Sequence, residues 1–231
     1  MMGIEFHKAE QRGRGEADWL HSRFSFSFAD YYDPKRMGFG KLRVLNDDII
    51  EPGAGFDTHP HDNMEIITIV TEGSLRHTDS TGSTAILKPG DIQVMSAGSG
   101  ILHSESNASD TQQLKLFQIW IEAKEKNIQP RHEERRFTLT KNRWTEVVSG
   151  KKSKDSLYIH QDARIFLGNS NKEYISNYKL PKGRGIFMMV IKGDAEVEGK
   201  SLKDRDAITI TEAKQITIKA KGSLLAIEVP L

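Results

Sequence analysis

The chain has 231 residues, enough for one large all-β domain or two small ones. Charged residues make up 28% of the chain and hydrophobic residues 37%, which is the balance of a folded protein with a core. The net charge of +1 gives no electrostatic reason to expect binding to nucleic acid or to a membrane surface. The absence of cysteine excludes disulfides and thiolate metal sites.

The N-terminal residues lack the apolar segment of a secretion signal. No run in the sequence reaches the length of a membrane span. We therefore expect a cytoplasmic protein with no membrane partner.

Three phenylalanines near the N-terminus alternate with serines, at Phe24, Phe26 and Phe28. Side chains at every second position of a strand share one face. The pattern predicts a strand that places three rings on one face, packed in a core.

Short apolar segments separated by glycine, proline, asparagine and aspartate follow along the chain. They predict strands at 42–48, 66–70, 92–95 and 114–121. Strands this short, spaced by turn residues, favour a sandwich or barrel over helix-linked parallel sheets.

Between residues 122 and 154 the sequence becomes charged and weakly periodic, which predicts a crossing between two domains. The strand pattern then returns at 185–191, 207–210, 215–218 and 223–229, with a hairpin turn near Gly199. We place an N-terminal metal-binding domain at residues 1–135 and a second domain without metal ligands at 136–231. The second domain contains one histidine, His160, and no H-x-H.

Two segments carry potential metal ligands, each as a pair two residues apart. His59 and His61 form the first pair, and His103 and Glu105 follow a glycine-rich turn. Residues i and i+2 of a strand project from the same face, so each pair can converge on one point. If the segments pair within one barrel, all four groups face a single ion. Imidazole and carboxylate without sulfur suit iron, manganese, nickel, cobalt, copper or zinc.

Other residues remain open to more than one interpretation. The remaining histidines form no such pair, and we expect surface or structural roles for His7, His21, His77, His132 and His160. His160 is the partial exception, because it could stabilise the domain interface. Several apolar residues could line a ligand pocket or pack in the core: Phe39, Phe56, Met64, Met95 and Leu102.

The two ligand segments resemble known motifs. The first matches the cupin pattern G-x5-H-x-H-x3-E at Gly53, His59, His61 and Glu65, and the second resembles the other cupin motif at Gly90, Gly98, His103 and Asn107. Several further landmarks resemble the pirin family: Tyr31-Tyr32-Asp33-Pro34, His59-Pro60-His61, Met95-Ser96-Ala97-Gly98 and His103-Ser104-Glu105. The resemblance covers essentially the whole chain.

The resemblance implies two tandem cupin (jelly-roll) barrels, a bicupin, in which only the N-terminal barrel binds a metal. Its ligands would be His59, His61, His103 and Glu105, holding one divalent ion, with iron(II) expected first. Strict alternation also places Glu65 on the inner face, unless a bulge at Asp62-Asn63 turns it away. The pirin pattern favours Glu105 over Glu65 as the fourth ligand.

For several bacterial members the resemblance implies quercetin 2,3-dioxygenase activity. The leading hypothesis is therefore metal-dependent cleavage of a flavonol by dioxygen, with Glu105 as the catalytic base that accepts the proton of the 3-hydroxyl. The alternative is a non-enzymatic, metal-binding and redox-responsive transcriptional cofactor or regulatory binding protein, with a regulatory protein as its partner. A sugar-phosphate isomerase is disfavoured, because no basic phosphate-binding cluster is evident near the metal motifs.

Overall fold

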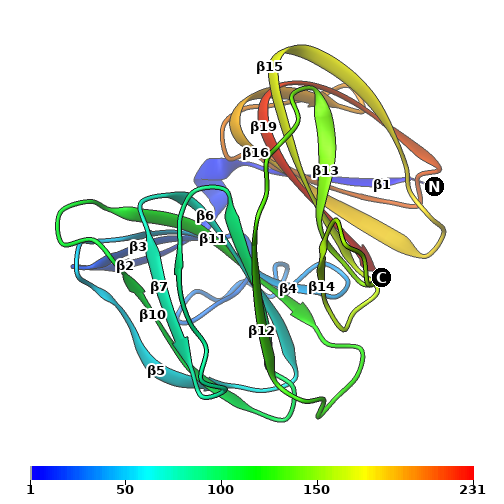
Figure 1. Cartoon of the computed structure of the whole chain (residues 1–231). Helices are drawn as coiled ribbons and strands as arrows, with labels where there is room; N and C mark the ends of the chain where they lie inside the picture. Colours follow the sequence, from blue (N-terminus) through cyan, green and yellow to red (C-terminus); the bar gives the residue numbers. More distant parts are fainter. Residues whose placement is uncertain (1) are drawn as a thin grey trace.

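The computed structural model describes residues 2–231, whose regular secondary structure is β-strand apart from one 3₁₀ turn, η1 (Ala9–Gln11). The strands form two lobes, which correspond to the two halves of the chain except that the first strand, residues 3–7, belongs to the C-terminal lobe (Figure 1). The predicted all-β fold of two tandem cupin barrels is confirmed. Among residues 2–231 there is no helix long and apolar enough to cross a membrane.

The N-terminal lobe is built from two antiparallel sheets. The larger contains, in spatial order, β12 (Arg131–Arg136), β9 (Asp91–Ser96), β6 (Met64–Glu72), β11 (Leu114–Glu122), β4 (Leu42–Ile50), β3 (Leu20–Phe24) and β2 (Gly13–Ala17). The smaller contains β5 (Gly55–His61), β10 (Ile101–Asn107), β7 (Leu75–Asp79) and β8 (Thr84–Leu87). Leu75 and Leu87 of the smaller sheet pack with Ile50 and Leu114 of the larger one, so the two sheets enclose a common interior.

The C-terminal lobe is a single sheet of eight strands. They are β1 (Gly3–His7), β18 (Ala207–Thr211), β16 (Arg184–Val197), β19 (Gln215–Pro230), β15 (Arg164–Lys179), β13 (Arg143–Ser149), β14 (Leu157–Tyr158) and β17 (Lys200–Leu202), the last paired with β16. Figure 1 shows β1, in blue, beside the late strands, because it pairs with β18. The domain boundary after residue 135 stays a prediction.

The segment predicted to cross between the two domains contains two strands, one in each lobe. β12 pairs with β9 of the N-terminal lobe, and β13 pairs with β15 of the C-terminal lobe. β12 reads Arg-His-Glu-Glu-Arg-Arg and lies at the edge of its sheet. An edge strand can carry charged side chains on its solvent face, which masks the usual apolar alternation.

The predicted phenylalanine stripe is wrong. β3 ends at Phe24, so the alternation that would align the three rings does not continue. Phe26 packs 5.8 Å from Phe187 of the C-terminal lobe, measured between ring centroids. Phe24 and Phe28 instead lie 5.5 Å apart and line a cavity in the N-terminal lobe.

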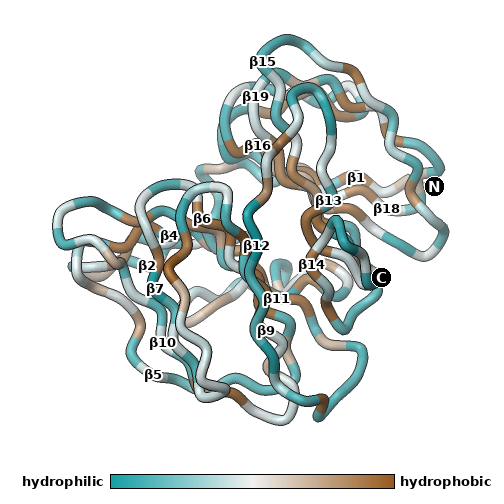
Figure 2. The backbone as a smooth tube through the Cα atoms, in the orientation of Figure 1, coloured by the Kyte–Doolittle hydropathy of each residue, from teal (hydrophilic) through white to brown (hydrophobic). Residues whose placement is uncertain are grey.

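The largest core joins the two lobes. It combines Phe26, Leu45 and Phe117 with Phe187 and Ile227, all buried. Figure 2 shows that the parts of β11, β13 and β16 where the lobes meet carry hydrophobic residues, coloured brown. Because this core is continuous, we expect the lobes to unfold as one cooperative unit.

The substitution Phe187→Ala tests this shared core. Phe187 is fully buried, and its removal should lower the free energy of unfolding by about 3–5 kcal/mol. Ile175→Ala is the control, because Ile175 is 55% exposed and should change stability by less than about 0.5 kcal/mol. Urea denaturation followed by fluorescence measures both. Equal effects of the two substitutions would contradict a shared core.

Candidate metal centre

Three histidines converge inside the N-terminal lobe. β5 pairs antiparallel with β10, which places His59 directly opposite His103. The ring centroids of His59 and His103 are 4.5 Å apart, and His61 lies 4.8 Å from His59 and 4.9 Å from His103. One nitrogen of each ring lies within 4.8 Å of the others, so the three imidazoles can share one ion.

The turn before β10 depends on glycine. Gly98 has φ of +51°, a conformation that L residues with a side chain rarely adopt. A Cβ at this position would lie 2.1 Å from the carbonyl oxygen of Ile128. This tight turn leads directly into the strand that carries His103.

The local environment favours the neutral form of His61 and His103. Burial, followed by the charges of neighbouring histidines, lowers the pKa of His61 to about 4 and of His103 to about 3. His59 Nδ1 lies 2.7 Å from the carbonyl oxygen of Asp57 and must donate to it, so Nε2 is the nitrogen that a neutral His59 ring offers to a metal. Neutral imidazoles with free lone pairs are the form that binds metal.

His103 provides an independent test of the fit to a metal. Both of its ring nitrogens are buried and have no hydrogen-bond partner within the described part of the chain. Leaving buried polar atoms without partners is costly. A metal ion would satisfy one nitrogen of His103, so the residues present fit such an ion.

Glu105 lies beside this group, held by three polar side chains. Gln93 Nε2 donates to its Oε1 at 2.6 Å, Gln118 Nε2 to its Oε2 at 2.7 Å, and the Thr68 hydroxyl is 3.2 Å from Oε1. Complete burial raises the pKa of the Glu105 carboxyl. An oxygen of Glu105 clusters with nitrogens of His103 and His77. Its role as the fourth ligand stays a prediction.

Glu65 occupies a different environment. The chain turns at Asn63, which has φ of +50°, so β5 ends and Glu65 belongs to β6 in the other sheet. There Glu65 Oε2 accepts a hydrogen bond from the Ser96 hydroxyl at 2.7 Å. A turn, rather than the expected bulge, directs Glu65 away from β5.

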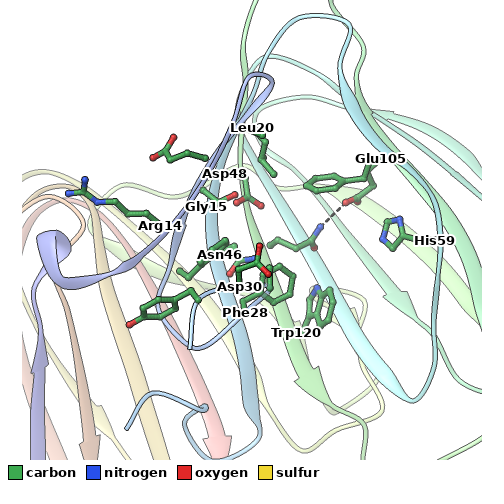
Figure 3. A pocket seen from close by; sticks show the side chains of 18 of the residues that line it. Arg14, Gly15, Leu20, Phe28, Asp30, Asn46, Asp48, His59, Glu105 and Trp120 are labelled. Atoms are coloured by element: carbon green, nitrogen blue, oxygen red, sulfur yellow. Dashed lines mark hydrogen bonds between the residues drawn. The ribbon is translucent and has the colours of Figure 1, made fainter. Parts of the chain in front are cut away.

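The histidines open onto a cavity of about 480 Å³. Figure 3 shows Phe28 and Trp120 at its wall, near His59, with Asn46 and Asp48 beside them. Of the five apolar residues considered from the sequence, only Phe56 lines this cavity. Met95 lies in a core, and Met64 and Phe39 pack against cores. Leu102 is partly exposed.

Asp48 provides a pH-dependent test of this environment. Burial raises the pKa of the Asp48 carboxyl from 3.8 to about 7. The folded state therefore keeps a proton that the unfolded chain releases, and stability falls as pH rises through this interval. In Asp48→Asn this decrease in stability with rising pH should disappear. The stability of the variant relative to wild type should rise by about 3 kcal/mol between about pH 4.5 and pH 8.

Urea denaturation of both metal-free proteins at the two pH values measures this effect. A difference in unfolding free energy that is the same at both pH values would contradict the raised pKa of Asp48.

A second histidine cluster was not expected from the sequence. His77, Asp79 and His132 offer ligand atoms within 4.8 Å of one another. His77 is fully buried, so a surface role is excluded for it, and its ring stacks on His132 at 4.4 Å with an interplanar angle of 10°. One feature of the sequence could have indicated this cluster. His77 and Asp79 are two residues apart, the same i, i+2 spacing as in the predicted metal ligands.

His160 lies where the lobes meet, as considered from the sequence. Its carbonyl oxygen accepts a hydrogen bond from the amide of Lys124 at 2.8 Å. The neighbouring Gln161 donates to the carbonyl oxygen of Glu122 at 2.7 Å. The segment therefore links the C-terminal lobe to the end of β11.

Comparison with known proteins agrees with this geometry. Residues 5–121 match the family model described as Pirin, and residues 146–229 match the model described as Quercetinase C-terminal cupin domain. A protein of Escherichia coli K12 named quercetin 2,3-dioxygenase is 42% identical over 218 residues, covering 94% of each chain. A pirin-like protein of Caulobacter vibrioides is 39% identical over 214 residues, covering 91% of this chain and 92% of the relative.

Among solved structures, bacterial pirin YhhW of Escherichia coli in complex with nickel(II) superimposes with a TM-score of 0.95. It is 40% identical and covers 99% of each chain. The likeness thus includes both lobes, and that relative was solved with a bound metal. Together with the family model that spans the histidine motifs, these matches show that the chain belongs to the pirin family.

Proposed function

We propose that this protein is a metal-dependent dioxygenase that cleaves a flavonol such as quercetin. The observation that carries the proposal is the convergence of three imidazoles on a cavity of about 480 Å³ with aromatic residues in its wall. Relatives named quercetin 2,3-dioxygenase support the choice of substrate class.

We propose that His59, His61 and His103 hold one divalent ion, with Glu105 as the fourth ligand and iron(II) as the native metal. Imidazole and carboxylate ligands suit iron, and the nickel complex of the pirin from Escherichia coli supports metal binding at this kind of site. When bound, such an ion supplies Lewis acidity toward a substrate hydroxyl and a redox centre for dioxygen chemistry.

The role proposed for Glu105 is to accept the proton of the substrate 3-hydroxyl on a carboxylate oxygen. Its raised pKa makes the ionised carboxylate a stronger base than an exposed glutamate. The amides of Gln93 and Gln118 donate to opposite oxygens and so fix the orientation of the carboxyl group. Ring cleavage of the deprotonated flavonol by dioxygen would then release carbon monoxide.

The aromatic wall would bind a flat ligand and exclude water. The Trp120 ring packs edge-on against His61 at 4.8 Å and against Phe28 at 5.3 Å. Phe56 lies on the same cavity, 6.3 Å from His59. Contact with these aromatic side chains would compensate a planar ligand for the water that it loses on binding. It would also place the ligand beside the proposed metal ligands.

Single-turnover and steady-state assays with quercetin test the proposal. Protein loaded with iron(II) and checked by elemental analysis should bleach the flavonol absorbance and release one carbon monoxide per flavonol consumed. His59→Ala, prepared in parallel, should do neither. Metal-loaded protein that turns over no flavonol, but binds a regulatory protein only when the metal is present, would refute the enzyme and favour a transcriptional cofactor.

A further inference from the structure

His77 and Asp79 lie directly across the β10–β7 ladder from two proposed metal ligands. Asp79 is the register partner of His103, and His77 is the register partner of Glu105. Both side chains are completely buried, and His77 Nε2 lies 2.8 Å from Asp79 Oδ2. A histidine–carboxylate pair thus stands beside the proposed ligands on the neighbouring strand.

The surroundings of Asp79 decide where the proton of His77 lies. Asp79 Oδ1 accepts hydrogen bonds from the Thr81 amide at 2.8 Å, the Thr81 hydroxyl at 2.6 Å and the Ser83 amide at 3.3 Å. A carboxyl group with three such donors stays ionised and can only accept. His77 Nε2 must therefore donate to Asp79, and in the neutral ring Nδ1 of His77 is then an acceptor.

Nδ1 of His77 has no hydrogen-bond partner among residues 2–231, although it is buried. His103 lies close by, with ring centroids 5.5 Å apart, and both of its nitrogens also lack partners. A histidine that binds metal through one nitrogen keeps an N–H on the other, which is usually held by an acceptor. His77 places an unused acceptor beside that ring.

We infer that His77 is a positioning residue, whose Nδ1 accepts the free N–H of His103 in the metal-bound protein. Asp79, His77 and His103 then form one hydrogen-bonded chain that fixes the tautomer and orientation of the ligand ring. This inference rests on the proposed metal site. It does not depend on which substrate the metal site acts on.

The alternative, a second ion held by His77, Asp79 and His132, conflicts with the ring geometry. The rings of His77 and His132 are parallel within 10° and stacked at 4.4 Å, so their in-plane lone pairs do not converge on one point. Stacking instead holds the plane of the His77 ring. His132 is itself held by Gln93, whose Oε1 lies 3.1 Å from His132 Nε2.

Substitutions that mimic one nitrogen at a time test the role of His77. His77→Gln keeps a donor near the Nε2 position, toward Asp79, but has no acceptor at the Nδ1 position. His77→Asn places its amide oxygen near the Nδ1 position. Nickel(II) titrations of the full chain by calorimetry should show binding about 10–100-fold weaker for His77→Gln, with partial recovery in His77→Asn. His21→Gln, at an exposed histidine, is the matched control.

Spectroscopy separates positioning from a purely structural effect. In metal-free, ¹⁵N-labelled protein the shifts of His77 should report a neutral ring protonated at Nε2. The visible spectrum of the cobalt(II)-loaded protein should change in His77→Gln and not in His21→Gln. Protonation of His77 at Nδ1, or wild-type nickel affinity together with an unchanged cobalt spectrum in His77→Gln, would overturn the inference.

His103→Ala distinguishes failure of this inference from failure of the metal site. Loss of nickel binding in His103→Ala, with wild-type binding in His77→Gln, contradicts the positioning role alone. Wild-type binding in both variants contradicts the metal site itself. None of these measurements uses a flavonol, so their results can be interpreted even if the protein does not turn over quercetin.

Discussion

His61→Ala and His103→Ala should each lose most of the bound metal while the protein stays folded. Each substitution removes one of three converging nitrogens. Loss of an outer-shell partner already weakens metal binding by about 10–100-fold, so loss of a ligand should weaken it by more than about 100-fold. The fold should survive, because the cores of both lobes are built from other residues.

Elemental analysis after dialysis measures the bound metal, and circular dichroism with a thermal melt measures the fold. His21→Ala serves as the control, because His21 lies on the surface of the N-terminal lobe and pairs with Glu16. Full metal occupancy in His61→Ala or His103→Ala would eliminate that residue as a ligand.

Glu105→Gln should reduce flavonol turnover by about 100–10,000-fold, the usual contribution of a general base. The side chains are nearly the same size, so the fold should change little. Glutamine cannot accept the substrate proton at its amide nitrogen, whereas three histidines remain to hold the ion. The loss of turnover should therefore exceed the loss of bound metal.

Turnover per bound metal ion is the quantity to compare between wild type and Glu105→Gln. Glu65→Gln is the matched control, since Glu65 is equally buried but bonded to Ser96 on another sheet. Unchanged turnover in Glu105→Gln would exclude the base role. A larger effect in Glu65→Gln would make Glu65 the better candidate.

The proposed metal ligands could be named from the sequence because strand alternation is a local rule. His59 and His61 are two residues apart on one strand, and the same spacing relates His103 and Glu105. The structure brings His59, His61 and His103 together through the pairing of β5 with β10. Glu105 needed more than alternation, because the register shifts between His103 and Glu105.

The residues around the ligands depend on pairings that no local pattern specifies. His77 meets the site because β7 pairs with β10, and Gln93 and Gln118 reach Glu105 from β9 and β11 of the opposite sheet. Phe26 leaves its expected face because the strand ends at Phe24. In each case long-range register or a strand end decides where the side chain goes.

Oxygen consumption by the purified, metal-analysed protein in the presence of quercetin tests the central proposal most directly. Flavonol absorbance is followed in the same sample, with His61→Ala as the metal-depleted control. We expect oxygen uptake that requires the metal and matches flavonol loss mole for mole. Metal-loaded protein that consumes no oxygen with quercetin or any other flavonol would contradict the dioxygenase.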